Sequence, residues 1–337
     1  MCRRQWVAWR SLALALGLLP VTSGELVAAA VIPHGDFAYD PALLSNATQR
    51  EAAQRLRNAS LLAGAFILRA KPQVVFMTTP HGLALTSDFL LYQNRALAGA
   101  APVGGDLGPG APIYKVPMSL RTDPLVDALL ADLRAQGANV TGIQAFADSA
   151  PLPLSWGEIL PLSFLETAVD TTGSASGGVG SGTGVVIMGV PYRRLTEDFT
   201  MVAELGRLGA HLAAFFERTA LRVAWVVSSD LAHTHTVAGW PGPYGPSPSA
   251  GPFDAAVGRW MATLRSESLT EEAASLERAG AKSCGFTGLV ALDGALAALG
   301  GCEAWQPRLL ALEAPTYYGM GVATFERRAA SQRPLLV

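Results

Sequence analysis

The stretch LRVAWVVSSDLAHTHTVAG, residues 221–239, joins an apolar run to a polar segment that contains two histidines. The apolar part, 221–230, predicts a β-strand buried on both faces, as in a parallel sheet covered by helices. Asp230, His233 and His235 stand at its carboxyl end. Two interpretations are open: a polar loop that caps the strand, with Asp230 as a cap, or an acid–base histidine beside a metal ion.

Around this stretch, apolar runs alternate with segments whose apolar residues recur at helical spacing. The apolar runs predict strands at 26–32, 72–79, 139–147 and 185–191, and two more between 308 and 326. The helical spacing predicts helices at 48–70, 123–137, 157–169, 196–219, 255–266, 269–280 and 285–299. We expect the helix at 157–169 to break at Pro161. The alternation predicts an α/β fold, a single domain with a central mixed β-sheet flanked by helices.

Composition limits the class of protein. The chain has 337 residues, of which 50% are hydrophobic and 15% are charged, and its formal net charge is −2. This length and apolar content are enough to bury a sizeable core. Lysine and arginine do not cluster outside the N-terminus, so the sequence lacks the basic patch of a nucleic-acid-binding protein. We therefore expect no nucleic acid among its partners.

Two segments stand outside the alternating pattern. Residues 1–24 combine a basic, acid-free start with the apolar run SLALALGLLPV and small residues, which is typical of a leader for export or for an organelle. The apolar run is too short to span a bilayer, so we expect no transmembrane span in the mature protein. An ordered arm on a cytoplasmic protein is the alternative. Residues 171–184, rich in Gly, Ser and Thr, predict a flexible loop within a domain over 25–330.

Three of the five histidines, His34, His81 and His233, follow predicted strands by a few residues. Ligands of α/β proteins gather at the carboxyl ends of strands, so these imidazoles are candidates for one shared pocket. Neutral imidazoles bind Fe(II), Zn(II) and similar ions. The tripeptide PHG occurs at 33–35 and at 80–82, and its glycine allows close approach of the backbone. The alternative is that each histidine is an ordinary loop residue.

A series of short segments resembles the class III (LigB-type) extradiol ring-cleavage dioxygenase superfamily, which also contains the Memo-type proteins. The segments span nearly the whole chain after the leader and read, in order, VIPHGDFAYDP, TTPHG, LSWGEILPLSFL, SSDLAHTH, GPYGPSPSAGPFD, KSCGFTGLVALDGAL and ALEAPTYYGMGVATF. By this resemblance, His34 and His81 correspond to the two metal-binding histidines. His233, in SSDLAH, corresponds to the histidine that acts as acid–base catalyst beside the metal.

The resemblance implies a LigB-like fold and a non-haem Fe(II) dioxygenase. Such an enzyme cleaves a catechol-like aromatic ring with O2, next to the two hydroxyls instead of between them. Two histidines and one carboxylate hold the ion and leave coordination positions open. The neighbouring histidine takes a proton from the substrate and later returns one. Some relatives work as two-subunit enzymes, so a homo-oligomer or a partner subunit is compatible with the resemblance.

This sequence departs from the family pattern at the third ligand. The family places a carboxylate some fifty residues after the catalytic histidine, and here Cys284 stands at that point, as in Memo-type proteins. A thiolate favours Zn or Cu, or gives a redox-sensitive iron site. Glu277, seven residues earlier, is the alternative ligand. Cys284 as a small buried core residue is the other alternative.

A second departure concerns the substrate. Many of these dioxygenases carry a DHG segment, and here the matching stretch is SWG, so that Trp156 replaces a second active-site histidine. Trp156 is therefore a candidate to stack on an aromatic ligand, or it simply packs. His235 and Tyr317 are the other candidates for substrate contact. Both departures favour an alternative function, a Memo-like protein that binds a metal or a ligand without catalysis.

Overall fold

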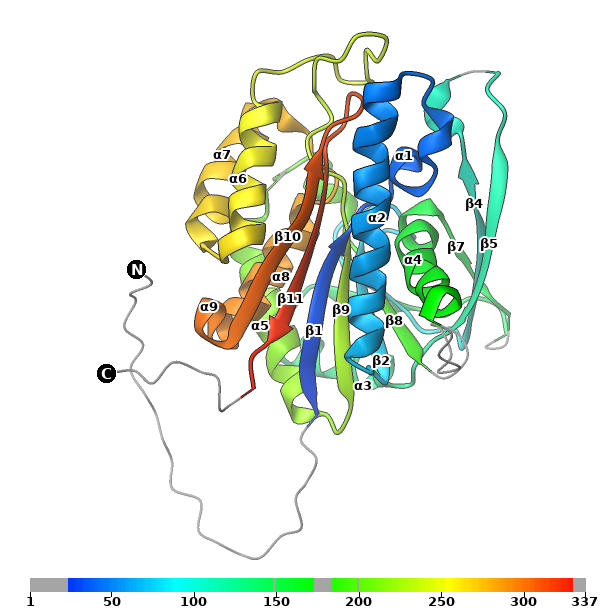
Figure 1. Ribbon diagram of the computed structural model, residues 1–337. Coiled ribbons are helices and arrows are strands. Elements are labelled where there is room, and N and C mark those ends of the chain that lie inside the picture. The colour runs from blue at the N-terminus through cyan, green and yellow to red at the C-terminus, as the bar shows by residue number, and fades with distance from the viewer. Residues whose placement is uncertain (1–23, 109, 148–149, 173–182, 199, 330–337) are drawn as a thin grey trace, which may run out of the picture.

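The protein is built around an eight-stranded mixed sheet with helices on both faces, beside a three-stranded sheet (Figure 1). The computed structural model describes residues 24–108, 110–147, 150–172, 183–198 and 200–329. This architecture confirms the predicted α/β class with one central mixed sheet. Most of the predicted leader (1–23) and most of the predicted glycine-rich loop (173–182) lie outside the described residues.

The large sheet has a parallel centre with antiparallel additions on both sides. Its strand order is β10 (Trp305–Glu313), β11 (Met320–Arg327), β1 (Glu25–Ile32), β9 (Arg222–Ser228), β2 (Val74–Thr79), β8 (Gly184–Gly189), β3 (Phe89–Tyr92) and β6 (Val140–Ile143). Strands β1, β9, β2 and β8 pair in parallel, whereas β11 and β3 join them in antiparallel pairs. The four parallel strands therefore end at the same edge of the sheet.

The small sheet was not predicted from the sequence. Its strand order is β5 (Tyr114–Arg121), β4 (Ala96–Val103) and β7 (Leu152–Leu154). These strands carry Gly, Pro and charged residues and are buried on one face at most, so they lack the continuous apolar run of the central strands. Strand β3 was missed as well, because an apolar run of only four residues does not identify a strand.

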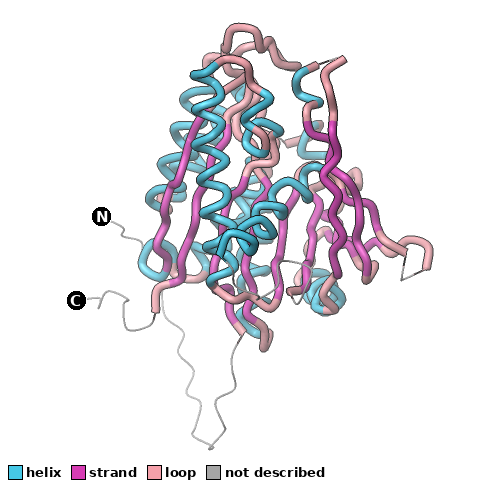
Figure 2. The backbone as a smooth tube through the Cα atoms, turned by 45° about the vertical axis from the view of Figure 1, so that its right-hand side comes forward, coloured by secondary structure: helices cyan, strands magenta, loops and turns pink. Residues whose placement is uncertain are grey.

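Helices cover both faces of the large sheet (Figure 1 and Figure 2). One face carries α1 (Asp36–Tyr39), α2 (Ala47–Arg69) and α4 (Trp156–Thr172), and the other carries α3 (Leu125–Ala135), α5 (Val202–Arg218), α6 (Ala250–Thr263) and α8 (Phe286–Ala298). Short elements complete the chain: α7 (Ala274–Leu276), α9 (Gly301–Ala304) and 3-10 turns at Pro41–Leu43, Gly105–Leu107 and Tyr192–Leu195. The predicted helix at 269–280 is instead mostly π-helical, at Ser268–Ala273 and Glu277–Ala281.

Helix α4 continues through Pro161, which corrects the predicted break. A proline at this position lacks the N–H that would bond the carbonyl of Gly157, four residues earlier. That carbonyl accepts a hydrogen bond from Ser228 Oγ of β9 at 2.5 Å. The backbone oxygen that the proline leaves without its helical partner is therefore satisfied from outside the helix.

Strand β1 shows how the sheet builds two cores. Its residues are buried along almost the whole strand, as predicted for a strand covered on both faces. Ala29 and Val31 belong to the core under α5 and α8, whereas Ala30 and Ile32 belong to the core under α2 and α4. This alternation is the two-residue period of a strand.

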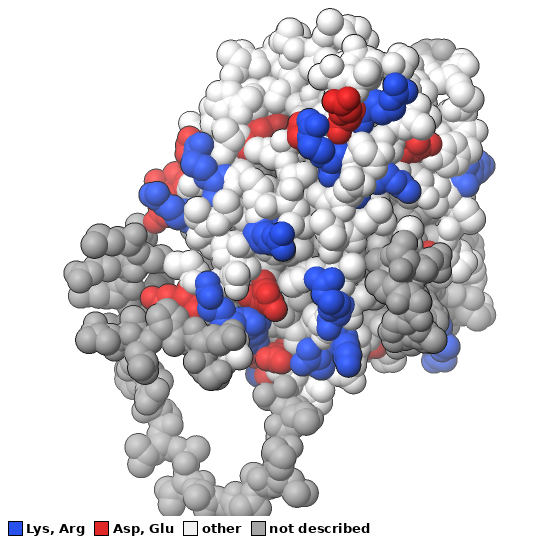
Figure 3. Space-filling view, viewed as in Figure 1, with Lys and Arg blue, Asp and Glu red and all other residues white. Residues whose placement is uncertain are grey.

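Most charged side chains lie on the outside, although a few, such as Glu158 and Arg194, are buried. On the face shown in Figure 3, basic and acidic residues lie among one another on a largely uncharged surface. Two of the ion pairs on the exposed surface are Arg55–Glu313 and Arg222–Glu25. Within the part of the chain that the structure describes, no helix is both long and apolar enough to cross a bilayer.

Helices α5 and α8 are packed closely through glycine. A Cβ atom on Gly209 would lie 1.9 Å from the carbonyl oxygen of Ala291 and 2.8 Å from the nitrogen of Ala295. A Cβ on Gly206, one turn earlier in α5, would meet nothing within 4 Å. The close approach of the two helices therefore depends on the absence of a side chain at Gly209.

We therefore predict opposite effects for two alanine substitutions on α5. Gly209→Ala should lower the free energy of unfolding by about 1–3 kcal/mol, because the new methyl group collides with the backbone of α8. Gly206→Ala should raise it by about 0.5–1 kcal/mol, because alanine favours the helix and the space is open. Denaturant unfolding of the two variants measures both effects, and equal effects would contradict the close contact.

Candidate metal centre

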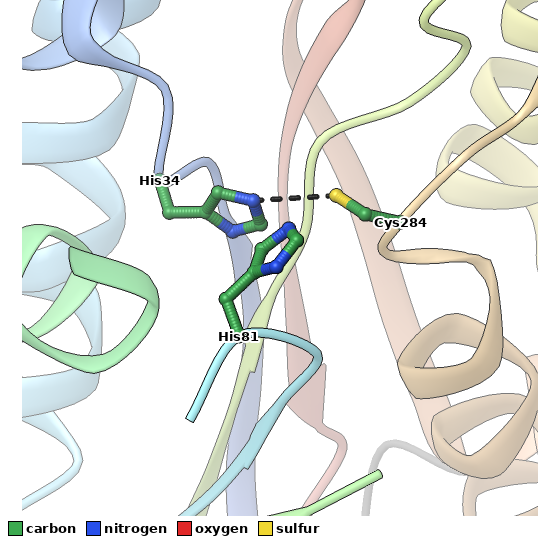
Figure 4. A group of neighbouring side chains, drawn as sticks. All are labelled: His34, His81 and Cys284. Atoms are coloured by element: carbon green, nitrogen blue, oxygen red, sulfur yellow. Dashed lines mark hydrogen bonds between the residues drawn. The ribbon is translucent and has the colours of Figure 1, made fainter. Parts of the chain in front are cut away.

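Neighbouring parallel strands bring distant histidines together. His34 follows β1 by two residues, and His81 follows β2 by two residues. Strand β9 lies between β1 and β2, and it leads into the segment that carries Asp230 and His233. The imidazole rings of His34 and His81 have centroids 4.8 Å apart, so these two side chains meet at one point (Figure 4).

Cys284 reaches the same point from the opposite side. It lies in the loop before α8, and its Sγ is 3.3 Å from Nε2 of His34 (Figure 4). One ligand atom each of His34, His81 and Cys284 lies within 4.8 Å of the others. A tetrahedral zinc ion with bonds of about 2.0 Å to nitrogen and about 2.3 Å to sulfur separates those two donors by about 3.5 Å. The distance of 3.3 Å between Sγ and Nε2 therefore fits a thiolate and an imidazole that share one ion, with His81 near enough to join them.

Asp230 belongs to the same cluster, which the sequence did not reveal. Its Oδ1 accepts a hydrogen bond from the backbone N–H of His34 at 3.1 Å, and its Oδ2 is 3.4 Å from His34 Nε2. Ligand atoms of Asp230, His233 and Cys284 also lie within 4.8 Å of one another. Asp230 thus brings a carboxylate to the imidazoles, beyond the capping role that its place in the sequence indicated. The signal was present: an aspartate directly after a buried strand and three residues before a histidine.

His233 is oriented by its own backbone and by an aromatic ring. Its Nδ1 lies 2.8 Å from the carbonyl oxygen of Leu231, which can only accept, so Nδ1 carries the proton and Nε2 is left as an acceptor. The ring of Tyr318 stacks on the imidazole at a centroid distance of 5.5 Å. Burial lowers the pKa of His233 to about 4. Near neutral pH the side chain is therefore an uncharged imidazole in which Nε2 is the unprotonated nitrogen.

The two PHG loops need their glycines, as the sequence indicated. A Cβ on Gly35 would lie 2.5 Å from the ring of Tyr318. A Cβ on Gly82 would lie 2.0 Å from Oε1 of Glu158 and 2.3 Å from the hydroxyl of Tyr92. The hydroxyl of Tyr92 donates to Glu158 at 3.0 Å, so a buried hydrogen-bonded pair supports the loop that carries His81.

The cluster opens into a cavity of about 750 Å³. Trp156, at the start of α4, lines it and stacks on His81 at a centroid distance of 5.2 Å. Tyr317 also lines it, with its ring 6.2 Å from that of His233. Two of the three residues expected to contact substrate therefore face the same space as the cluster of His34, His81 and Cys284.

The structure places the other two candidates differently. Both carboxylate oxygens of Glu277 accept from the backbone N–H of Ser283, at 3.2 and 3.0 Å, and Glu277 belongs to neither group of ligand atoms, although it lines the cavity. Nε2 of His235 is 2.7 Å from Asp254 on α6, and His235 is not among the residues that line the cavity. Of the two alternatives for the third ligand, Cys284 is the one close to both histidines.

Burial is the largest cause of the shifted pKa values in the cluster. It lowers the pKa of His81 to about 3 and that of His34 well below its usual value, so both rings are neutral ligands. Burial also raises the pKa of the Cys284 thiol, and the charge of Arg194 acts in the opposite direction. Arg194, which the sequence did not single out, is itself buried and donates to the carbonyl of Pro80 at 3.0 Å. A bound cation deprotonates a coordinating thiol outright, so this cysteine and a metal favour each other.

Comparison with known proteins adds no family to this picture. No protein-family model matches the chain, and no curated protein matches it significantly. The chemical capacity of the site therefore rests on its own geometry and donor atoms.

We predict that metal binding depends on the two clustered histidines. His34→Ala or His81→Ala should weaken Zn(II) binding by more than about 100-fold, because each removes a neutral imidazole donor. His211→Ala, which changes a histidine in the middle of α5, should bind as the unchanged protein does. Competition with a chromophoric chelator measures the affinities. Equal affinities for all three variants would mean that the cluster is not the metal site.

A second prediction concerns pH and Glu158. Burial raises the pKa of this carboxyl from 4.5 to about 7. Between these values the folded chain binds more protons than the unfolded chain, so the free energy of unfolding falls as the pH rises. Glu158→Gln should reduce that fall by up to about 3 kcal/mol, and the exposed Glu51→Gln should leave it unchanged. Denaturant unfolding at a series of pH values tests this, and an unaltered slope in Glu158→Gln would refute it.

Proposed function

We propose that this protein is a non-haem Fe(II)-dependent dioxygenase that cleaves a catechol-like aromatic ring with O2. One observation supports this most directly: ligand atoms of His34, His81 and Cys284 converge within 4.8 Å in a cavity of about 750 Å³, and His233 lines the same cavity. Metal ligands beside a neutral base, in a space large enough for an aromatic ring, are the parts that this chemistry needs.

The donor set supports iron through Asp230. Two histidines and one carboxylate, with positions left open, are the ligand set of non-haem Fe(II) oxygenases. His34 and His81 supply the imidazoles, and Asp230 supplies a carboxylate 3.4 Å from Nε2 of His34. A bound ion of this kind supplies Lewis acidity and open coordination positions. In this proposal, Cys284 adds a softer donor to the same ion.

The protein's own groups position the substrate and move its proton. Nε2 of His233 takes the hydroxyl proton of the catechol, since Nδ1 is bonded to the carbonyl of Leu231. Tyr318 holds the imidazole by stacking, and its hydroxyl donates to Asp106 at 2.6 Å. Trp156 and Tyr317 supply aromatic walls for the ring of the substrate.

A second candidate function is metal or ligand binding without oxygen chemistry, as in a Memo-like protein. Two observations favour it. Cys284 Sγ, a soft donor that suits Zn or Cu, lies 3.3 Å from Nε2 of His34. Trp156 stacks on His81 and occupies wall space where the resemblance expects a histidine. The two functions differ in the metal that is retained and in the consumption of oxygen.

The deciding experiment is anaerobic reconstitution with Fe(II), followed by addition of air and a panel of catechols. We expect oxygen uptake together with a yellow ring-fission product. His233→Gln should keep the iron and lower kcat by about 10²–10⁴-fold, because it removes the base. His235→Gln is the matched control, since it changes a histidine of the same loop that faces Asp254 instead of the cavity.

Two outcomes would count against ring cleavage. The first is the absence of oxygen uptake and of product with every catechol, although iron is bound. The second is the recovery of zinc or copper in preference to iron from the purified protein, again without oxygen uptake, which supports the second candidate. Cys284→Asp then offers a further comparison, because a carboxylate in place of the thiolate should shift the preference toward Fe(II).

A further inference from the structure

A backbone carbonyl at the start of α4 is available because of a proline. Pro161 has no N–H to give to the carbonyl of Gly157, four residues earlier in the helix. This oxygen points to β9, where Ser228 Oγ donates to it at 2.5 Å. A carbonyl can only accept, so the single hydroxyl proton of Ser228 is committed to this bond.

The same serine oxygen contacts the ring of His34. Nδ1 of His34 lies 2.8 Å from Ser228 Oγ, and both side chains are buried, with 3% and 1% of their surface exposed. Because the serine proton is directed to Gly157, the serine oxygen can only accept from His34. Nδ1 must therefore carry the imidazole proton. In the neutral ring this leaves Nε2 with a free lone pair, and Nε2 is the atom that faces Cys284 Sγ at 3.3 Å.

We propose that Ser228 is a positioning residue that fixes the tautomer and the orientation of His34, so that Nε2 is presented to the metal. The Gly157 carbonyl, the Ser228 hydroxyl and the His34 imidazole form a chain of hydrogen bonds that places the imidazole proton on Nδ1. The competing acceptor is Oδ2 of Asp230, which lies 3.4 Å from Nε2. Partners of this kind, which hold the second nitrogen of a ligating histidine, set its tautomer and raise its basicity. The inference rests on the proposed role of His34 as a ligand, but not on ring cleavage.

The neighbouring serine provides a matched control. Ser229 is equally buried, yet its Oγ has no hydrogen-bond partner among the described residues. Ser228 and Ser229 share the residue type, the burial and the end of β9, and they differ in the contact with His34. Removing the hydroxyl of Ser228 leaves the Nδ1 proton of His34 without its acceptor. Removing the hydroxyl of Ser229 breaks no hydrogen bond among the described residues.

The tautomer can be read directly in the metal-free protein. The chain has five histidines, so long-range proton–nitrogen NMR spectra of histidine-labelled protein are simple, and the spectrum of His34→Gln assigns the signal. We expect His34 to be protonated at Nδ1 in the unchanged protein, in Ser228→Thr and in Ser229→Ala. In Ser228→Ala we expect the Nε2-protonated form to appear. Unchanged protein with His34 protonated at Nε2 would overturn the inference without any substitution.

Metal affinity provides the second measurement. Ser228→Ala should bind Zn(II) about 10–100-fold more weakly than the unchanged protein. Ser228→Thr should restore most of that loss, because it retains the hydroxyl, and Ser229→Ala should show none. Equal affinity in Ser228→Ala and Ser229→Ala would overturn the positioning role. Failure of catechol turnover leaves these results intact, since neither the spectra nor Zn(II) binding involves oxygen chemistry.

Discussion

The structure depends on the parallel pairing of β9 between β1 and β2. In this register Ile32 of β1 lies opposite Ser228 of β9, so the strands end together and their following loops start at the same edge. The backbone N–H groups of Ser229 and His34 are then bonded to Ile32 and to Asp230 respectively. A shift by one residue would turn alternate side chains to the opposite face. The candidate metal centre exists because this register brings three loops to one point.

Burial imposes a second constraint on the same point. Buried polar side chains need defined partners, and here backbone groups supply several of them. Leu231 accepts from His233, Gly157 accepts from Ser228, and Asp230 accepts from the N–H of His34. Strand ends and a helix start provide these partners, so the imidazoles are held by the rigid part of the fold. Such support keeps neutral ligands aimed at one place before any ion binds.

The mixture of donors gives the site its chemical character. Imidazoles of His34 and His81 suit many transition metals, the thiol of Cys284 favours soft ions, and the carboxylate of Asp230 favours harder ones. The buried guanidinium of Arg194 acts to lower the pKa of the Cys284 thiol, against the larger effect of burial. The two candidate functions therefore differ in the donor that sets the metal preference of the site. In the proposed iron chemistry this donor is Asp230, and in metal binding alone it is Cys284.

Sequence patterns were informative where a segment depends on its own residues. Continuous apolar runs identified β1, β2 and β9 to within two residues at each end, because strands buried on both faces must be apolar throughout. The same patterns gave the α/β class and placed His34, His81 and His233 at strand ends. They failed for β4, β5 and β7, whose residues are buried only in part, and for Pro161, since the carbonyl that it leaves unbonded finds its partner on a serine of another strand.

The sequence by itself thus determined the class of fold and the residues that stand at the ends of its central strands. Only the tertiary structure decided which of them meet: Cys284 with His34 and His81, Glu277 with the backbone of Ser283, His235 with Asp254, and Asp230 with His34 and Cys284. The physical reason is that strand order and register are set by packing between segments that are far apart in the chain. A local pattern of apolar and polar residues does not indicate which strands are neighbours in the sheet.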